Sequence, residues 1–313
     1  PLEGQMWYNN TTGTLKVYKN IGGVWSSGGD LNTARSAVGG IGTQTTGLCV
    51  SGLLAHPTGT PGNVSTATEE YNGASWTTTG AVGTGRYTMG AAGTQTAALI
   101  NKGYPSTSAT TATELYDGST WTSGTASNFY SASLGSGGTQ TSAVTFGGSS
   151  AGPGGSATTD RTEEWDGSSW TLGGVLGTAR YQMSGNNVGT QTASLAIGGY
   201  VGGAQTTVEE YNGSSWTAGI ALPSGQGNAS RYGLQTAAVI ASGGSAPTTA
   251  ALIYDGSAWT AVGSLATGRP QSGGCGSTTS GLVFSGGLSP TAGRDITEEF
   301  NDPTISIQTV TTS

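Results

Sequence analysis

Residues 179–216 read ARYQMSGNNVGTQTASLAIGGYVGGAQTTVEEYNGSSW, and the same phrase recurs along the chain. In this copy the parts are an Ala-Arg pair, Gly-Thr-Gln-Thr, an apolar segment that ends in Gly-Gly, and a closing tryptophan; the glycine pair weakens to Ser51-Gly52 and Lys102-Gly103 in the first two copies. The closing tryptophans stand 43 to 51 residues apart, a period typical of propeller blades and repeat arrays. They are Trp25, Trp76, Trp121, Trp170, Trp216 and Trp259.

One repeat unit predicts a four-stranded antiparallel meander. Ala193, Leu195 and Ile197 alternate with smaller or polar residues, which indicates a strand with one better-buried face. Asn212-Gly213 suits a two-residue type I′ hairpin between the third and fourth strands. The four strands are expected at residues 181–188, 191–197, 207–211 and from 215 onward.

Such a meander cannot bury both of its faces alone, so the units must stack around an axis. The Tyr and Trp side chains of each unit are expected to fill the gaps between neighbouring units. Six inner-strand signatures are present. The sequence therefore predicts an all-β, six-bladed propeller with four antiparallel strands per blade.

The two ends of the chain complement each other. Trp25 has no inner strands before it, and the last unit lacks a tryptophan of its own. The N-terminal strand should therefore complete the last blade and close the ring, which removes free sheet edges. Residues 305–310 are the alternative closing strand. We expect residues 1–22 to be an N-terminal strand or attachment segment, residues 23–302 the propeller, and residues 303–313 a C-terminal tail.

The unit resembles the kelch repeat of kelch-type propellers and of the central domain of galactose oxidase. The matching elements are an Arg before the first strand, an apolar strand that ends in Gly-Gly, then Tyr and Trp, over roughly residues 23–302. The Gly-Thr-Gln-Thr phrase, with EGQMWYN at 3–9 and GTLK at 13–16, is similar to kelch-like proteins encoded by bacteriophages. There the opening phrase resembles segments of tail-fibre and other virion-associated proteins. The resemblance implies a non-enzymatic structural or adhesion protein, located in a virion or outside cells.

Composition argues against several classes of partner. Ten basic and seventeen acidic residues give a net charge of −7, and no basic stripe supports nucleic-acid binding. No run approaches the ~18 apolar residues of a membrane span. Cys49 and Cys275 are too few for a disulfide framework, and two buried thiols are favoured over a single bridge.

The candidate chemical groups favour structure over catalysis. The copper-radical oxidases of this fold imply two histidine ligands, whereas the chain has only His56, so we expect no metal, no cofactor and no enzymatic activity. Consecutive strand residues face opposite sides, so no Glu-Glu pair forms an acid–base dyad within itself. The Glu-Glu pairs recur at one blade position, which suggests pairing between blades, and the repeated arginines are the expected partners of one member of each pair. The alternative is an arginine rim at the channel mouth that binds an anion. The residues are Arg35, Arg86, Arg180 and Arg269, with Glu69-Glu70, Glu163-Glu164, Glu209-Glu210 and Glu298-Glu299.

The loops between the second and third strands are the variable part of the repeat. They should lie at one end of the ring, where loops on a rigid scaffold often carry recognition, although plain connectors are equally consistent. We expect the partner to be another virion protein or a host-surface glycan or protein, and a homo-oligomer stays open. The alternative function is a secreted carbohydrate-binding or carbohydrate-active propeller. The predicted binding residues are Tyr104, Asp160, Arg161, Tyr200, Arg294 and Asp295.

Overall fold

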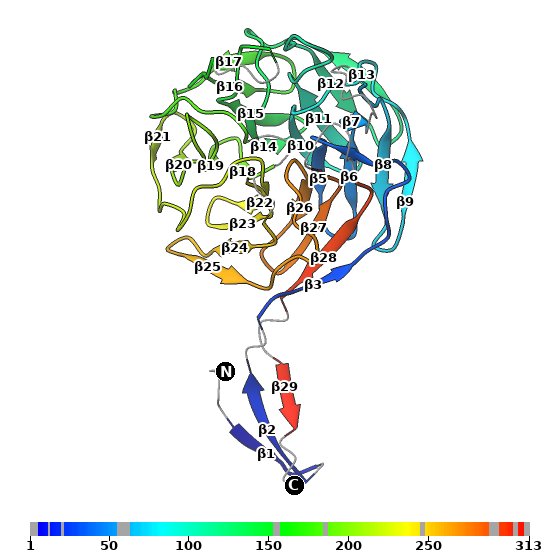
Figure 1. The fold of residues 1–313 in the computed structure, drawn as a ribbon, viewed down its shortest axis with the longest axis vertical. Helices are drawn as coiled ribbons and strands as arrows, with labels where there is room; N and C mark the ends of the chain where they lie inside the picture. The colour runs from blue at the N-terminus through cyan, green and yellow to red at the C-terminus, as the bar shows by residue number, and fades with distance from the viewer. Residues whose placement is uncertain are drawn as a thin grey trace.

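The computed structural model describes residues 6–11, 13–19, 22–54, 63–152, 157–183, 187–244, 248–287, 294–302 and 306–309. In these residues every regular element is a β-strand, and no helix is long and apolar enough to cross a membrane. Six four-stranded antiparallel sheets surround a central axis as the blades of a propeller (Figure 1). The predicted six-bladed, all-β fold is confirmed.

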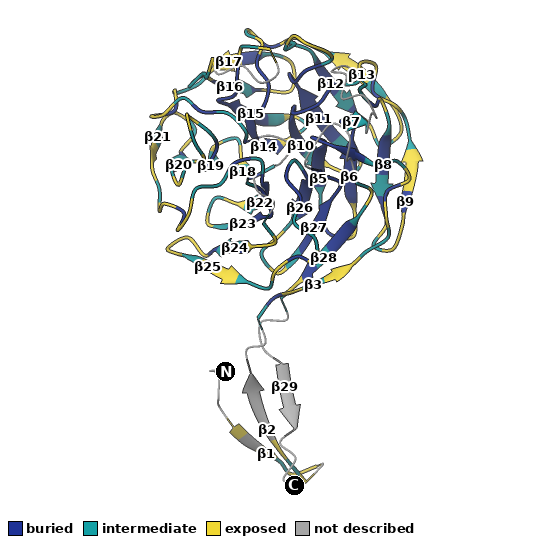
Figure 2. Cartoon of the chain, in the orientation of Figure 1, coloured by how far each residue is buried: buried dark blue, intermediate teal, exposed yellow. Residues whose placement is uncertain are grey.

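Each blade runs outward from the axis, with its first strand innermost. The inner strands are mostly buried and the outermost strands mostly exposed (Figure 2). Blade 1 contains β5 (Gly39–Gly42), β6 (Gly47–Val50), β8 (Thr68–Tyr71) and β9 (Trp76–Thr79). Blade 2 contains β10 (Gly90–Thr94), β11 (Ala97–Asn101), β12 (Thr113–Tyr116) and β13 (Trp121–Gly124). Blade 3 contains β14 (Gly135–Thr139), β15 (Ser142–Phe146), β16 (Thr162–Trp165) and β17 (Trp170–Leu172). Blade 4 contains β18 (Gly189–Thr190), β19 (Ala193–Ile197), β20 (Val208–Tyr211) and β21 (Trp216–Ala218). Blade 5 contains β22 (Ser230–Leu234), β23 (Ala237–Ala241), β24 (Ala251–Tyr254) and β25 (Trp259–Val262). Blade 6 contains β26 (Gly273–Gly276), β27 (Ser280–Phe284), β28 (Thr297–Asn301) and β3 (Val24–Ser27).

The N-terminal strand closes the ring, as predicted. Strand β3 pairs antiparallel with β28, and Trp25 lies opposite Phe300 with their ring centres 5.0 Å apart. The alternative closing segment pairs elsewhere, because β29 (Ser306–Thr309) lies against β2 (Thr14–Lys19). The last blade is therefore built from both ends of the propeller sequence.

The segments that flank the propeller form a separate three-stranded sheet. Its order is β1-β2-β29, with β1 spanning Met6–Asn9. Figure 1 draws this sheet outside the ring, beside the blade that contains β3 and β28. A short two-stranded sheet of β4 (Arg35–Ser36) and β7 (Leu53–Leu54) completes the strand inventory of the described residues.

Two local strand predictions for unit four are wrong. In β19, Ser194 to Ile197 are all buried, because neighbouring blades cover both faces of the second strand. The first strand begins at Gly189 and not at residue 181. Unit four has two additional residues before its Gly-Thr-Gln-Thr phrase. Gln182 and Gly189 are seven positions apart, whereas the equivalent Thr88 and Gly93 of unit two are five apart. Asn187 and Val188 bridge the inner strands of blades 3 and 5 instead of extending the ladder of their own blade.

The Asx-Gly turns differ from the predicted type I′ hairpin. Tyr211 pairs with Trp216, so the connection has four residues, and Gly213 has a φ of +90° while Asn212 stays outside the positive-φ region. The Asn212 Oδ1 accepts hydrogen bonds from the backbone N–H groups of Ser214 and Ser215. An aspartate accepts the same bonds, which explains why Asp and Asn alternate at this position. Hydrogen bonds from Thr120 and Ser119 hold the pKa of the equivalent Asp117 at about 2.

The glutamine of Gly-Thr-Gln-Thr joins each blade to the preceding one. Gln191 in blade 4 donates from Nε2 to the carbonyls of Ala143 at 3.1 Å and Trp165 at 2.7 Å, both in blade 3. Five of the six blades carry this pair of hydrogen bonds, and blade 6 has Thr278 at the equivalent position. The glutamines are Gln44, Gln95, Gln140, Gln191 and Gln235.

The Tyr and Trp of each unit pack together between blades, as predicted. Tyr211 and Trp216 have ring centres 4.8 Å apart, and the Trp216 indole N–H donates to Thr162 Oγ1 of the preceding blade at 2.9 Å. The same indole-to-threonine bond recurs for Trp76, Trp121 and Trp170. In these four tryptophans the indole N–H therefore finds its hydrogen-bond partner across a blade boundary.

A tyrosine of one blade and a glutamate of the preceding blade are replaced together. Tyr116 donates its hydroxyl to Glu70 Oε1 at 2.8 Å, and the same contact occurs for Tyr71–Glu299, Tyr211–Glu164 and Tyr254–Glu210. In blade 3, Trp165 stands in place of the tyrosine, Leu115 of blade 2 stands in place of the glutamate, and both belong to one apolar cluster. In blade 6, Phe300 stands in place of the tyrosine, and the glutamate position of blade 5 holds Ile253, which packs in a cluster with Trp25. Each boundary is thus either polar on both sides or apolar on both sides.

This pairing predicts a measurable coupling between Tyr116 and Glu70. Tyr116→Phe should lower the free energy of unfolding by about 1–3 kcal/mol, since it leaves Glu70 without its hydroxyl donor. Glu70→Leu in the same chain should recover most of that loss, because the boundary then matches the apolar pairs found elsewhere in the ring. Urea unfolding of the two single variants and the double variant measures the coupling; additive losses would contradict it.

The same pair gives the coupling a pH dependence. Burial raises the pKa of Tyr116 from 10.0 to about 12. The hydrogen bond to Glu70 is the next largest cause that raises this pKa. A raised pKa in the folded protein favours the protonated hydroxyl, so this contribution is present below pH 10 and declines as the pH rises through 12. The difference between the native chain and Tyr116→Phe should follow that decline.

A ring of backbone hydrogen bonds surrounds the axis at one end. Each bond joins an N–H to a carbonyl of the preceding blade, for example Thr88 to Ala37 at 2.9 Å and Ala37 to Gln271 at 2.7 Å; in blade 4 the donor is the N–H of Met183, which donates to Ser133. The residues at the six equivalent positions have φ between +51° and +62° although none is glycine. This end also carries the variable loops, since Tyr87 bridges Tyr104 and Tyr181 bridges Tyr200. The ring residues are Ala37, Thr88, Ser133, Gln182, Asn228 and Gln271.

Candidate binding surface on the variable-loop face

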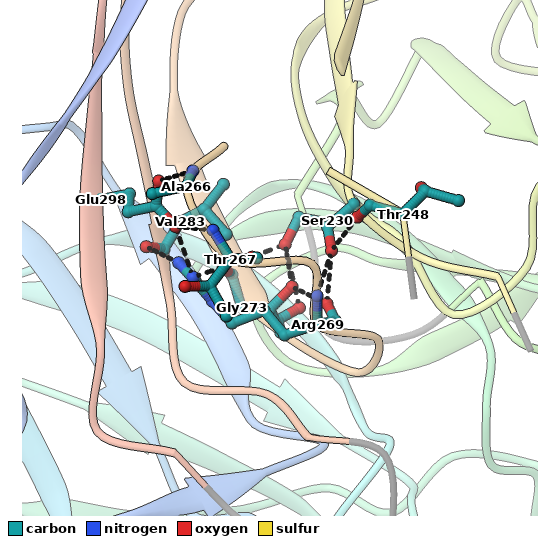
Figure 3. A network of polar contacts seen from close by, with 10 residues as sticks. Ser230, Thr248, Ala266, Thr267, Arg269, Gly273, Val283 and Glu298 are labelled. Carbon is teal, nitrogen blue, oxygen red and sulfur yellow. Dashed lines mark hydrogen bonds and ion pairs between the residues drawn. The ribbon is translucent and has the colours of Figure 1, made fainter. Parts of the chain in front are cut away.

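The four repeated arginines form buried ion pairs within their own blades. Arg35 Nη2 lies 3.0 Å from Glu69 Oε1, and Arg269 Nη1 lies 2.6 Å from Glu298 Oε1. Arg86 pairs with Glu114 and Arg180 with Glu209 in the same way. Figure 3 shows the network around Arg269, whose Nη2 also donates to the Val283 carbonyl at 3.0 Å. The predicted Arg–Glu pairing is confirmed for Glu69, Glu209 and Glu298, but the expectation that it joins neighbouring blades is wrong, because each arginine reaches a glutamate of its own blade. Arg86 pairs with Glu114, which belongs to no Glu-Glu pair.

The alternative, an exposed arginine rim, is wrong for these four residues. Their side chains are fully buried, and their charges are already matched by a glutamate. An anion at the channel mouth could not reach them without breaking a buried pair, which is costly because the remaining charge would be uncompensated.

Blades 3 and 5 depart from this pattern in different ways. Blade 5 has Gln226 in place of the arginine and Leu252 in place of the glutamate, so neither charge is present. Blade 3 has Ser131 in place of the arginine but keeps Glu163. Lys102, from the end of the second strand of blade 2, supplies the missing cation, with its Nζ 2.7 Å from Glu163 Oε2.

Lys102 is buried together with its partner. The two side chains are 1% and 0% exposed, and burial lowers the pKa of Lys102 while Glu163 opposes that shift. Glu163 also accepts hydrogen bonds from the backbone N–H and the side-chain amide of Asn128, both at 2.7 Å. The Lys102 Nζ lies 4.0 Å from the centre of the Phe129 ring, within the range of a cation–π contact.

The change in blade 3 exposes two aromatic side chains. Four units read Thr, a small residue and Arg at this position, whereas blade 3 reads Phe129-Tyr130-Ser131. Phe129 is half-buried, and Tyr130 is 55% exposed. The guanidinium carbon of Arg161 lies 4.9 Å from the centre of the Phe129 ring, and Arg161 itself is exposed. Aromatic and cationic side chains thus meet at one place on the variable-loop face.

Three adjoining hollows surround these side chains. The first, of about 390 Å³, lies beside Asn128, Phe129, Arg161 and the exposed Leu172 and Val175. The second, of about 320 Å³, shares Phe129 and Arg161 with the first and adds Tyr130, Ser150, Thr158 and Thr159. The third, of about 270 Å³, shares Tyr130 and Ser150 with the second and reaches Ser108 and Ala109. We call this series of hollows the blade-3 groove.

Of the predicted binding residues, only Arg161 lines the groove. Tyr104 is 3% exposed, and its hydroxyl donates to the Ala151 carbonyl at 2.7 Å. Its ring packs against Tyr87 with the centres 5.3 Å apart. Tyr200 is half-buried against Tyr181 in an edge-on arrangement. Both loop tyrosines therefore pack on tyrosines at the channel mouth.

The other three predicted residues do not gather with Arg161 in one site. Asp160 is half-buried, and its carbonyl accepts from the Leu176 N–H at 2.8 Å. Arg294 and Asp295 lie beside blades 1 and 6, where their carbonyls accept from the N–H groups of Arg35 and Leu31. The prediction for His56 lies outside the described residues.

The thiols and acidic groups of the described residues have structural surroundings. Cys49 and Cys275 are buried and unbridged, as predicted, and burial raises the pKa of Cys49 to about 11, which disfavours the reactive thiolate. No three His, Cys, Asp or Glu side chains gather there as metal ligands would. A scan against protein-family models finds no match, and no curated protein matches the chain. The blade-3 groove is thus the best-supported candidate for a binding site.

Proposed function

We propose that this chain is a non-enzymatic attachment protein that binds its partner through the variable-loop face. The observation that carries this proposal is the replacement of Thr-small-Arg by Phe129-Tyr130-Ser131 in blade 3. Four other units use the position for a buried ion pair, whereas blade 3 presents Tyr130 and Arg161 in a groove. Exposed aromatic residues and arginine are the side chains most often found at binding hot spots.

The proposal of a non-enzymatic role rests on how the acidic side chains are used. Five glutamates are held in buried ion pairs. Four others accept hydroxyl hydrogen bonds across blade boundaries. Carboxylates engaged in this way are poor general acids or bases, because a catalytic group must reach the substrate.

We further propose that the propeller is of kelch-like type and belongs to a bacteriophage virion, as a fibre tip or decoration. The support is the resemblance of the repeat and of the opening phrase at residues 3–9 to phage-encoded kelch-like proteins. The position of the flanking sheet is consistent with this role, because β1, β2 and β29 lie together at one side of the ring (Figure 1). A propeller held at one side would leave its variable-loop face accessible.

The binding role is tested by attachment of the purified chain to host cells and to phage particles. Tyr130→Ser with Arg161→Ser should reduce attachment at least tenfold and leave the thermal unfolding midpoint unchanged. Leu234→Ser is the matched control, because Leu234 is 57% exposed at the end of an inner strand, at the opposite face. Unchanged attachment of the double variant, with loss on removal of residues 1–21, would show that the propeller is only a spacer.

Location separates the virion role from the second candidate, a secreted carbohydrate-binding propeller. The hydroxyl-lined second hollow, with Ser150, Thr158 and Thr159, supports this candidate. An antibody against the chain should label purified phage particles in electron micrographs. Labelling confined to a secreted, particle-free fraction would favour the second candidate.

A further inference from the structure

We propose that the blade-3 groove binds an acidic glycan, a short chain of sugar rings that carries an anionic group next to Arg161. This inference rests on the proposed binding role of the variable-loop face and names the class of ligand. It follows from three features of the groove: the serial arrangement of its hollows, the chemistry of its lining and its charge.

The hollows lie in series and not around one deep pocket. Phe129 and Arg161 separate the first hollow from the second, and Tyr130 and Ser150 separate the second from the third. A ligand that fills all three is therefore an extended chain of linked groups. Volumes of about 390, 320 and 270 Å³ leave room for one sugar ring in each hollow.

The lining combines aromatic faces with hydroxyl groups. Tyr130 presents more than half of its surface to solvent between two hollows. The face of an aromatic ring carries partial negative charge, so it attracts the polarised C–H groups on the flat side of a sugar ring. Ser150, Thr158 and Thr159 add hydroxyls that can both donate and accept, which matches the hydroxyl groups of a sugar.

The charge of the groove favours an anionic ligand. Arg161 is exposed, and among the described residues its guanidinium forms no ion pair with a carboxylate. The other nearby cation, Lys102, is already paired with Glu163. On a chain with a net charge of −7, one uncompensated arginine beside an aromatic ring is a local positive site. A guanidinium binds carboxylate and sulfate groups through paired N–H donors.

An extended peptide suits this groove less well. Peptide recognition commonly uses a free sheet edge, an apolar groove for an amphipathic helix, or an aromatic-lined groove for a proline-rich segment, which offers few donors for hydroxyl groups. The second hollow, at the centre of the series, is lined by hydroxyls, two aromatic rings and an arginine. A peptide ligand is retained below as an outcome that would overturn the proposal.

The test uses the full chain on an array of neutral, uronic-acid, sialic-acid and sulfated glycans. We expect binding to be confined to acidic glycans and to fall at least tenfold between 50 and 500 mM NaCl. Carboxyl reduction of a bound uronic-acid glycan should also weaken binding at least tenfold. Arg161→Gln should remove the preference for acidic over neutral glycans. Tyr130→Ala should weaken all glycan binding, and Leu234→Ser should change nothing.

Separate outcomes overturn this inference and the proposed function. Binding to neutral glycans alone, or to no glycan on the array, would exclude an acidic glycan. If attachment to cells still required Tyr130 and Arg161 but was abolished by protease and not by glycosidases, the ligand would be a protein and the attachment role would stand. If attachment did not require these residues, both proposals would be wrong.

Discussion

Lys102→Met should lower the free energy of unfolding by about 3–5 kcal/mol, although it replaces a buried lysine by an apolar residue of similar length. The substitution leaves Glu163 fully buried without a counter-charge, with only the Asn128 hydrogen bonds and neighbouring dipoles to stabilise it. Urea unfolding followed by tryptophan fluorescence measures the loss. Arg161→Gln is the control, because it removes a nearby exposed charge and should change stability by no more than about 0.5 kcal/mol.

A second substitution makes this prediction specific to the ion pair. Ser131→Arg restores the arginine that the other charged blades carry, so Lys102→Met with Ser131→Arg should recover a large part of the loss. Ser131→Arg alone should destabilise the chain, because it places a second cation beside one glutamate. Equal stability of Lys102→Met and Arg161→Gln would contradict the requirement for Lys102. Failure of the double variant to recover would show that Phe129 and Tyr130 leave no space for the arginine.

Removal of residues 1–27 should destabilise the propeller by at least about 3–5 kcal/mol, the cost expected for emptying a packed aromatic site. The deletion removes Trp25 from its contact with Phe300 and exposes the edge of β28. A bare strand edge also invites pairing with other chains, so the truncated protein should self-associate. Thermal unfolding and sedimentation measure the two effects.

Removal of residues 1–21 is the matched control for that deletion. It takes away β1 and β2 but keeps β3, which closes the ring. The propeller should therefore unfold at nearly the same temperature as the full chain. A large loss of stability from this shorter deletion would mean that the flanking sheet, and not β3, maintains the ring.

The fold could be predicted because the sequence pattern of one blade recurs six times along the chain. The recurring Trp, Gly-Gly and Asx-Gly positions show where strands end, and closure by the strand of Trp25 follows from the missing tryptophan of the last unit. The Arg–Glu pairs could also be inferred, since both residues recur together. The turn type was missed because the Asx side chain, and not two residues with positive φ, organises the turn.

The candidate site could be predicted only in part. Tyr104 and Tyr200 stand in variable loops, which predicts that they are accessible. Their rings instead pack on Tyr87 and Tyr181, which precede the first strand of the same blade. Phe129 and Tyr130 stand within the constant part of the repeat and not in a variable loop, so the variation in loop length does not point to them. The available signal was the loss of Thr-small-Arg in one unit. The role of Lys102 required the structure, because its partner belongs to the next blade.

The paired replacement of tyrosine and glutamate has a consequence for how such a ring can be rearranged. A blade carries one half of each of its two boundaries, so moving it between neighbours of a different kind brings a polar half against an apolar one. Blade 2, for example, has Tyr116 toward blade 1 and Leu115 toward blade 3. Exchanging blades 1 and 2 would therefore leave Glu70 facing Trp165 and Tyr71 facing Leu115, whereas blades 1 and 4, which both carry a tyrosine and a glutamate, could change places with every border still matched. The borders restrict which blades can be exchanged, and a circular permutation, which keeps every border, should be tolerated where an exchange of blades 1 and 2 is not.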